Sequence, residues 1–448
     1  MQYKLTKNIG FNAVQVLSLG FFTVILIGGI ILSLPIASAN GEYTNFIDAL
    51  FTSTTSVCVT GLVTVDTGTH WNYFGKTVIM LLIEIGGLGF MSFATLIAII
   101  IGKKITLKER LLMQEAMNTF SFQGMVKMVK YVLVFTFSVQ LLGALLLATQ
   151  FIPELGVGKG IYYSIFHSVS AFCNAGIDII GNFNSVTAYH NNPVILLTIS
   201  FLIIIGGLGF TVWTEIYNLK SFRKITTHSK VVILVTAILL IGGTVLMLAF
   251  EWNNPNTMKG FSMPEKLLNS WFASVSPRTA GFNSISTDGM SGAGKFLTIV
   301  LMFIGGSPGS TAGGIKTTTL GILVLTLIGV VKGREDTEVF GKRFSKDLVY
   351  KAFTVFFVGL TIVIIMTMLL SITEVGASFE YILYEVTSAF GTVGLTLGLT
   401  PNLTWIGKLL IIFTMYLGRV GPLTVALALT KIKTSKGIRY PEDKVLIG

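Results

Sequence analysis

Seven segments of the chain are apolar and long enough to cross a lipid bilayer as helices, and no other feature constrains the fold as strongly. A transmembrane helix needs about 20 mostly apolar residues. The seven segments are residues 14–34, 77–101, 131–150, 194–217, 231–250, 349–370 and 406–429, and an eighth, 296–331, is interrupted by glycines. Charged residues make up 12% of the chain, about half the share in soluble domains. The sequence therefore predicts an all-α membrane protein with eight spanning helices.

The rest of the composition argues against several other classes of protein. Two cysteines give no disulfide framework, and the four histidines stand too far apart in the sequence to suggest a zinc site. The formal net charge of +11 would suit a nucleic-acid binder, but the distribution of charge along the chain offers another explanation. The first apolar segment lacks the basic start and short apolar core of a signal peptide, so we interpret it as a membrane helix. We expect no cofactor and no nucleic acid to bind this chain.

Four shorter stretches alternate with the spanning segments. They cover residues 46–56, 160–173, 264–277 and 379–391. Each is too short to cross a bilayer as a helix, and its length suits a helix that enters the membrane and turns back. The chain is therefore predicted to repeat one unit four times: spanning helix, re-entrant pore helix, turn, spanning helix.

Three sequence markers recur in the same order and support this fourfold repeat. A glycine follows each short segment, at Gly61, Gly176, Gly281 and Gly394, and these glycines are spaced almost evenly along the chain. An aromatic residue stands ten residues before each glycine, and a second glycine follows it inside a spanning segment: Phe51, Phe166, Trp271 and Tyr384, then Gly86, Gly206, Gly305 and Gly418. We predict a single transmembrane pore domain over residues 1–448. Its repeats are 11–103, 127–220, 229–332 and 347–431 around one pseudo-fourfold pore, followed by a tail at 432–448.

Lysine and arginine set the predicted orientation, because they gather on the cytoplasmic side of membrane proteins. With the N-terminus inside, the inner segments carry 23 of the 32 basic residues, and the outer connections carry 7. The outer connections hold 11 acidic residues against 8 on the inner side. The net positive charge is thus mainly an inside bias. Both termini are predicted to be cytoplasmic.

The four glycine turns are predicted to form a cation filter. Irregular backbone occurs at membrane depth only where protein buries it or water reaches it, and the C-terminal ends of the short helices carry partial negative charge. Glycine allows main-chain carbonyl oxygens to line up toward a dehydrated cation. The predicted filter residues are Val59, Thr60, Gly61, Asn174, Ala175, Gly176, Thr279, Ala280, Gly281, Thr392, Val393 and Gly394. The alternative, glycines that only permit close helix packing, does not require four of them in register.

Three residues beside the predicted filter have other possible roles. Cys58 and Cys173 each stand three residues before a filter glycine, so repeat equivalence explains them without a disulfide or a metal. Arg278 holds the same position in the third repeat. Because a cation facing a cation path would repel the substrate, we expect its side chain to point behind the filter or into outer water.

A glycine-rich loop interrupts the second spanning helix of the third repeat. Five glycines and a proline in twelve residues do not sustain a helix. The loop consists of Gly305, Gly306, Ser307, Pro308, Gly309, Ser310, Thr311, Ala312, Gly313, Gly314, Ile315 and Lys316. The spacing of two of its glycines is that of a phosphate-binding loop, but an isoleucine precedes the lysine and apolar helix flanks both sides. A flexible loop inside the membrane, below the filter, is the better interpretation.

Arg419 lies in the middle of the last spanning segment, where a charge costs at least about 2.5–3.5 kcal/mol. It is expected either to face the cavity, as a positive barrier in the conduction path, or to bind carbonyls freed by the broken helix of the third repeat. Both roles are compatible. Glu84 is expected to face the pore or a neighbouring helix, and Glu215 lies near a cytoplasmic end.

These residues resemble the Trk/Ktr/HKT superfamily of potassium uptake proteins over essentially the whole chain, most closely the bacterial KtrB-type pore subunit. The resemblance implies four helix–pore helix–helix units around one pore, with a key glycine in each filter loop. Some sodium-selective plant relatives carry serine at the first position, whereas here all four are glycine, which resembles the potassium-preferring pattern. The filter is shorter than the Thr-Val-Gly-Tyr-Gly type, which implies weaker discrimination against sodium.

The resemblance also implies a gate, partners and a location. In the family a glycine-rich intramembrane loop matching residues 305–316 gates ion passage, and Arg419 contributes to the barrier. The membrane subunit is expected to be a homodimer in the plasma membrane. It is expected to be controlled by a cytosolic, octameric RCK-type ring whose subunits, not this chain, bind ATP or ADP.

Two other functions remain as alternatives. A secondary transporter for another solute would show an inverted repeat, whereas these units all start on the same side. A membrane-embedded enzyme would need a cluster of reactive side chains that the sequence does not provide. The sequence leaves open whether ions flow passively or are coupled to sodium or protons.

Overall fold

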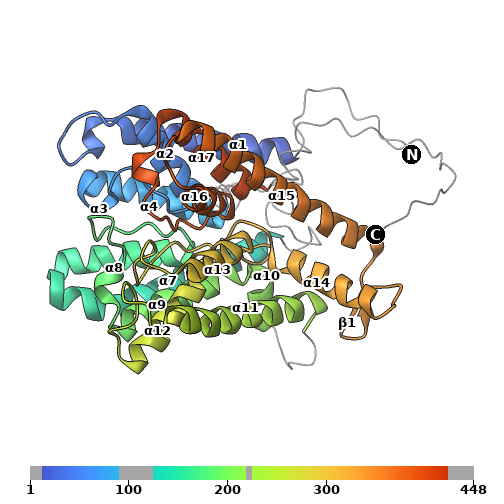
Figure 1. Ribbon diagram of the computed structural model, residues 1–448. Coiled ribbons are helices and arrows are strands. Elements are labelled where there is room, and N and C mark those ends of the chain that lie inside the picture. The colour runs from blue at the N-terminus through green and yellow to red at the C-terminus, as the bar shows by residue number, and fades with distance from the viewer. Residues whose placement is uncertain (1–12, 90–124, 218–224, 422–448) are drawn as a thin grey trace, which may run out of the picture.

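The computed structural model describes residues 13–89, 125–217 and 225–421, and over these ranges the chain is predominantly helical (Figure 1). Within them the only strand pair is the short antiparallel hairpin of β1 (Glu338–Val339) and β2 (Lys342–Arg343). The stretch between the first two predicted repeats, residues 104–126, lies largely outside the described residues. The tail predicted at 432–448 lies wholly outside them.

A long apolar helix begins each of the four predicted repeats. The four helices are α1 (Ala13–Ser33), α7 (Met125–Leu155), α11 (Thr227–Glu251) and α15 (Lys346–Thr373), and each contains a stretch long and apolar enough to cross a membrane. Large apolar side chains are exposed on them, among them Leu19, Leu142, Ile241 and Ile365. Exposed apolar surface on this scale is unfavourable in water and suits contact with lipid.

A short helix follows each long one at the predicted place. The short helices are α2 (Phe46–Val57), α8 (Val157–Phe172), α12 (Met263–Val275) and α16 (Phe379–Gly391), and each packs against the long helix that precedes it. Side-chain caps define where three of them begin: Asn45 accepts from the backbone of α2, Ser262 with Glu265 forms a capping box on α12, and Ser378 accepts from the backbone of α16. Their C-terminal halves form the buried centre of the molecule.

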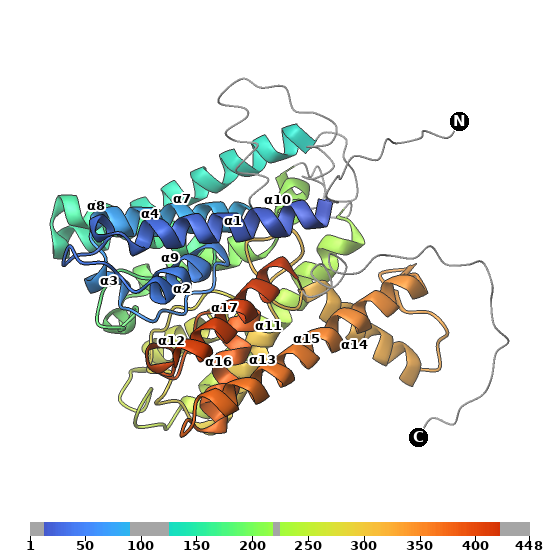
Figure 2. The same cartoon turned by 90° about the horizontal axis from the view of Figure 1, so that it is seen from above.

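The second helix of each unit is shorter or broken. The first unit has α4 (Tyr73–Leu88), the second α9 (Pro193–Gly207) and α10 (Phe210–Tyr217), the third α13 (Gly292–Phe303) and α14 (Thr317–Val331), and the fourth α17 (Trp405–Val420). Figure 2 shows α14 and α15 extending away from the remaining helices toward the hairpin that joins them. Short connecting helices complete the described residues: η1 (Pro35–Ala37), α3 (Thr67–His70), η2 (Thr187–Tyr189) and η4 (Thr400–Asn402).

The second spanning helix predicted over 194–217 is not continuous. α9 and α10 meet at 94°. α4 ends at Leu88 and α17 at Val420, and the predicted segments 77–101 and 406–429 extend past residues 89 and 421, outside the described residues. Each of these three helices ends where a glycine adopts a positive φ, namely +81° at Gly89, +95° at Gly209 and +93° at Gly421. Glycine tolerates this left-handed conformation, which ends a helix.

Candidate functional site

The turns after the four short helices meet in a closed ring. We call them the four glycine loops: residues 59–61, 174–176, 279–281 and 392–394. A methyl group added at any of their glycines would collide with a backbone carbonyl of the next loop: Gly61 with Ala175, Gly176 with Ala280, Gly281 with Val393, and Gly394 with Thr60. The contacts run through the loops in chain order and return from the last to the first. Segments from opposite ends of the sequence therefore surround one centre.

The four glycine loops share a backbone conformation although their side chains differ. Their glycines have φ values of +98°, +64°, +80° and +96° in chain order. Two residues before each glycine, a residue other than glycine is also left-handed: Val59 at +55°, Asn174 at +60°, Thr279 at +68° and Thr392 at +51°. Such conformations are uncommon, and they persist only where the surrounding structure fixes them. The repeated feature is thus the course of the main chain.

The short helices hold the loops through backbone amides. Thr60, Ala175 and Val393 donate to carbonyls five residues earlier, at 2.8 to 2.9 Å, and Ala280 donates to Ser276 at 2.9 Å. The hydroxyls of Thr55 and Ser388 accept from the glycine amides of the first and fourth loops, at 2.9 and 3.0 Å. Among the described residues, the carbonyl oxygens of the four glycine loops accept no hydrogen bond. The donors are therefore used within the protein, while these acceptors remain available.

The glycines inside the second spanning segments make the same contact in the first, second and fourth repeats and a different one in the third. Gly86, Gly206 and Gly418 each press against a carbonyl at the C-terminal end of the short helix of their own repeat: Val57, Phe172 and Phe390. Gly305 instead presses against the carbonyl of Gly313, within the broken segment. The third repeat thus departs from the pattern at the position of the 305–316 loop.

The 305–316 loop separates α13 from α14, as predicted, and its ends are joined by backbone hydrogen bonds. Gly305 donates to Ile315 at 2.9 Å, and Thr317 donates to Gly306 at 3.0 Å. The loop also fills the bend between α9 and α10, where Phe210 donates to Gly309 at 2.8 Å. The ammonium of Lys316 donates to the carbonyl of Ala312 at 2.6 Å, which closes the loop on itself.

The middle of this loop lies directly against two of the glycine loops. A methyl group added at Gly313 would collide with the side chain of Thr392 in the fourth loop. Thr311 Oγ1 lies 3.3 Å from the carbonyl oxygen of Phe172 and 3.1 Å from the side-chain amide of Asn174 in the second loop. The Thr311 amide donates to Gly206 at 3.3 Å. The 305–316 loop therefore lies beside the ring, and Thr311 bonds to neighbouring segments through both its backbone amide and its side chain.

Arg419 connects this loop to the first repeat. One guanidinium nitrogen donates to the carbonyl of Thr311, and the other donates to Gly86 and, at 3.4 Å, to Gly87. Within the described ranges Arg419 makes no ion pair with a carboxylate, so its guanidinium is balanced only by hydrogen bonds to backbone carbonyls. The sequence predicts that Arg419 either faces the cavity or binds carbonyls of the broken helix. Its hydrogen bond to Thr311 is of the second kind.

Comparison with known proteins now identifies the family. The family model described as TrkH, cation transport protein, matches residues 13–438. The chain belongs to this family. It is 49% identical over 443 residues to the potassium/sodium uptake protein NtpJ of Enterococcus hirae, covering 98% of this chain and 97% of that one. It is 42% identical to the Ktr system potassium uptake protein B of Bacillus subtilis, covering 99% of both chains.

A solved structure supports the fold. The potassium transporter TrkH from Vibrio parahaemolyticus superposes with a TM-score of 0.72 at 18% identity, covering 96% of this chain and 87% of that chain. The relatives in the TrkH family are ion transport proteins rather than enzymes. The family therefore agrees with the resemblance found in the sequence.

The side chains beside the ring point away from its centre. Arg278 is buried behind the third loop, and its guanidinium lies 3.5 Å from the carbonyl of Thr236 in α11. Cys58 and Cys173 are buried free thiols in different repeats. Glu84 bonds to Gln140 of α7 and to Cys173, so it faces neighbouring helices. Glu215, near the C-terminal end of α10, accepts from the Thr226 amide at 2.6 Å, just before α11 begins.

Sequence reasoning missed one further repeated contact. Ser53, Ser168 and Ser274 on the short helices donate to carbonyls of the preceding long helices, at 2.6 to 2.8 Å. A glycine of the long helix lies against each of these serine hydroxyls: Gly28, Gly143 and Gly243. Each of these glycines precedes the ring glycine of its own repeat by a similar length of chain. That spacing was the available signal for them in this sequence.

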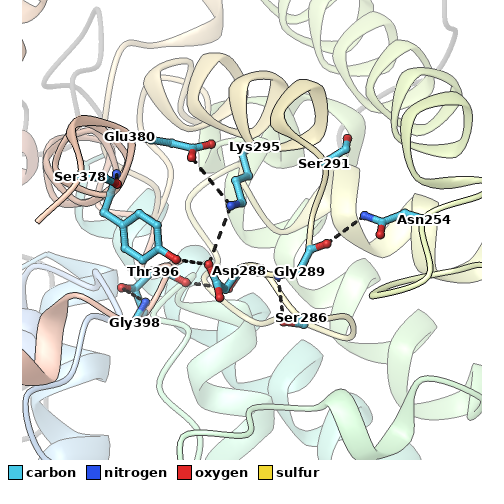
Figure 3. A network of polar contacts seen from close by, with 12 residues as sticks. Asn254, Ser286, Asp288, Gly289, Ser291, Lys295, Ser378, Glu380, Thr396 and Gly398 are labelled. Atoms are coloured by element: carbon cyan, nitrogen blue, oxygen red, sulfur yellow. Dashed lines mark hydrogen bonds and ion pairs between the residues drawn. The ribbon is translucent and has the colours of Figure 1, made fainter.

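Contacts near the N-terminal ends of the short helices tie neighbouring repeats together. Figure 3 shows Lys295 of α13 between Asp288 and Glu380. The Lys295 ammonium lies 3.8 Å from each carboxylate, and the Tyr381 hydroxyl donates to Asp288. Thr287, beside this cluster, donates to the carbonyl of Thr396 at 2.6 Å. The fourth and first repeats are joined in the same way, by an ion pair of 2.6 Å between Lys408 and Asp48. These contacts join the third repeat to the fourth and the fourth to the first.

Proposed function

We propose that this protein takes up potassium ions across the plasma membrane through a channel-like pore whose filter is the ring of four glycine loops. The closed ring of backbone contacts carries this proposal. In it, eight spanning segments and four re-entrant helices surround one pseudo-fourfold axis, and both termini are cytoplasmic. The carbonyls of the twelve loop residues replace the hydration shell of the ion, as in other carbonyl filters.

Potassium is the proposed substrate for two reasons. Relatives at 49% and 42% identity are named as uptake proteins for potassium and sodium or for potassium. All four ring positions hold glycine, which resembles the potassium-preferring pattern of the superfamily. Because each loop supplies only a short run of carbonyls, the expected discrimination against sodium is moderate.

The 305–316 loop and Arg419 are proposed to form the gate. The loop lies against the second and fourth glycine loops, where it would obstruct an ion leaving the ring. Arg419 adds a positive charge at the same place, and a cation in a low-dielectric path is a barrier to another cation. In this proposal the loop moves aside when the pore opens.

Control is proposed to come from another chain. The relative from Bacillus subtilis is named as part of a Ktr system, and we infer that this chain likewise works with a separate regulatory component. We propose a homodimer of the membrane subunit bound to an octameric cytosolic RCK-type ring. ATP or ADP would bind that ring, and this chain would hold no cofactor of its own.

Uptake of radioactive rubidium into proteoliposomes, with sodium as competitor, tests the function. We expect saturable rubidium uptake that potassium inhibits more strongly than sodium. Gly61→Ser should weaken the preference for rubidium over sodium, because its side chain enters the ring. Uptake with an unchanged preference in this variant would exclude the ring as the filter. Absence of rubidium uptake from folded protein, supplied with its regulatory subunit and nucleotide, would exclude potassium transport.

A further inference from the structure

Glu84 is a buried carboxylate that the proposed function does not use. It lies on α4 with 7% of its surface exposed. Its Oε2 accepts from the Gln140 side chain at 2.9 Å and from the Cys173 thiol at 3.3 Å. Its Oε1 is buried and has no hydrogen-bond partner among the described residues. A buried carboxylate is costly unless its surroundings compensate it, so its presence calls for a role.

Two sets of contacts that hold the 305–316 loop involve residues next to Glu84 or next to its partner Cys173. We call these contacts the two anchors of the loop. On α4, Glu84 is followed by Gly86 and Gly87, whose carbonyls accept from Arg419. On α8, its partner Cys173 is followed directly by Asn174, whose side chain contacts Thr311. The path through Arg419 and the path through Asn174 therefore both lead back to the contact between Glu84 and Cys173.

The two connections end at the same residue. Arg419 holds the carbonyl of Thr311, and Asn174 holds its hydroxyl. Gly87 also packs against Cys173, where a methyl group would collide with the thiol. A carboxylate that joins α4 to the end of α8 thus fixes the spacing between the two groups that hold Thr311.

We propose that Glu84 is a positioning residue that keeps the 305–316 loop in its closed place by fixing both anchors of Thr311. This inference rests on the proposed gate function of the loop. Glu84 does not touch the ion in this account.

Substitutions of Glu84 separate its charge from its shape. Glu84→Gln retains the length of the side chain and removes the charge, while Cys173→Ala removes one of the two donors. Loosening either anchor raises the population of the open loop. We expect both variants to raise rubidium flux through the isolated membrane subunit, Glu84→Gln by roughly five-fold and Cys173→Ala by less, which is the range expected for the loss of one typical hydrogen bond. The rubidium-to-sodium ratio should stay unchanged, because the ring is intact.

The chain offers matched controls for each variant. Cys58 is the repeat equivalent of Cys173 and makes no hydrogen bond to a carboxylate within the described residues, so Cys58→Ala should leave flux unchanged. Glu251→Gln alters a carboxylate that is also buried but binds Asn254, Thr257 and Ser291 at the outer end of α11. Glu251→Gln should likewise not raise flux. Thermal unfolding of each purified protein identifies variants that fail to fold, and Cys173→Ala then carries the test if Glu84→Gln is lost.

A double-mutant cycle with Arg419→Ala and a loop deletion separates this inference from the gate proposal. If Glu84 acts through Arg419, Glu84→Gln adds less flux in the Arg419→Ala background than alone. If deleting residues 310–313 raises flux but Glu84→Gln and Cys173→Ala do not, the role of Glu84 is wrong and the gate stands. If the deletion leaves flux unchanged, the gate proposal fails and the inference fails with it. A changed ion preference in Glu84→Gln would also contradict a positioning role.

Discussion

The four glycine loops and the 305–316 loop are both irregular backbone at the centre of the molecule, yet they are built on opposite principles. The glycine loops occur four times, share one backbone conformation and contact each other in a ring. The 305–316 loop occurs once, and side chains from other repeats hold it. A site that surrounds a spherical ion benefits from symmetry, because equivalent carbonyls approach from all sides. A movable obstruction needs only one element, and a single copy breaks the symmetry at little cost to the ring.

The largest effect is expected from deleting residues 310–313. Without this segment the part of the loop that contacts the second and fourth glycine loops is gone. We expect rubidium flux through the membrane subunit to rise about ten-fold or more, which corresponds to a barrier lowered by about 1.4 kcal/mol or more. Proteoliposome flux assays measure it. An unchanged or lower flux in a folded protein would make the loop a structural element.

A smaller effect on flux is expected from Arg419→Ala. This change removes the bonds from α17 to Thr311 and to Gly86, together with the positive charge. Flux should rise several-fold with the rubidium-to-sodium ratio preserved. Arg419→Lys keeps the charge but cannot bond both carbonyls in the same way, so an intermediate flux would show that geometry and charge both contribute. A loss of selectivity without a change in flux would place Arg419 in the filter instead.

The ring should respond in the opposite way, with a change in preference and not in gating. Gly61→Ala adds a methyl group against the Ala175 carbonyl, at a φ of +98°. Gly41→Ala is the matched control, because Gly41 has a φ of +70° and nothing within 4 Å of the added methyl group. Both carry a strain of about 1–2 kcal/mol, but only Gly61→Ala should lower the rubidium-to-sodium ratio. Equal effects of the two changes would mean that strain, and not the ring, sets the preference.

The smallest effect is expected at the ion pair between Lys295 and Asp288. Asp288→Asn breaks the ion pair with Lys295, and the Asp288 side chain is 58% exposed. Exposed pairs contribute about 0–1 kcal/mol, so thermal stability should fall only slightly and ion preference should not change. Thermal unfolding and competition assays measure the two quantities. A marked loss of selectivity would show that the ties between repeats determine the geometry of the ring.

The sequence predicted the ring better than the helices around it. The spacing of the ring glycines and the break expected at 305–316 follow from residue types that dictate backbone conformation, and the structure contains both the glycine conformations and the break. The bend at Gly209 was missed because the string at 205–210 is almost wholly apolar and fits a spanning helix. The same string occurs at 85–90, where Gly89 also has a positive φ. Its third glycine was the available signal.

The contacts of the 305–316 loop could not be predicted from the sequence, for a different reason. Thr311, Asn174 and Arg419 come from three repeats, and no spacing along the chain relates them. The sequence predicted that Arg419 needs carbonyls or a cavity, because a buried charge demands compensation. It did not identify Thr311 or Gly86 as the partners. The direction of Glu84 was likewise undetermined, because both faces of α4 are apolar in sequence.

The most direct test of the central claim is to locate the ion itself. Anomalous diffraction from crystals of the protein grown with rubidium should place a rubidium ion on the axis of the ring, within coordination distance of the carbonyls of residues 59–61, 174–176, 279–281 and 392–394. Raising the sodium concentration should lower its occupancy. Rubidium bound elsewhere in the membrane region, with none inside the ring at saturating concentration, would contradict the account.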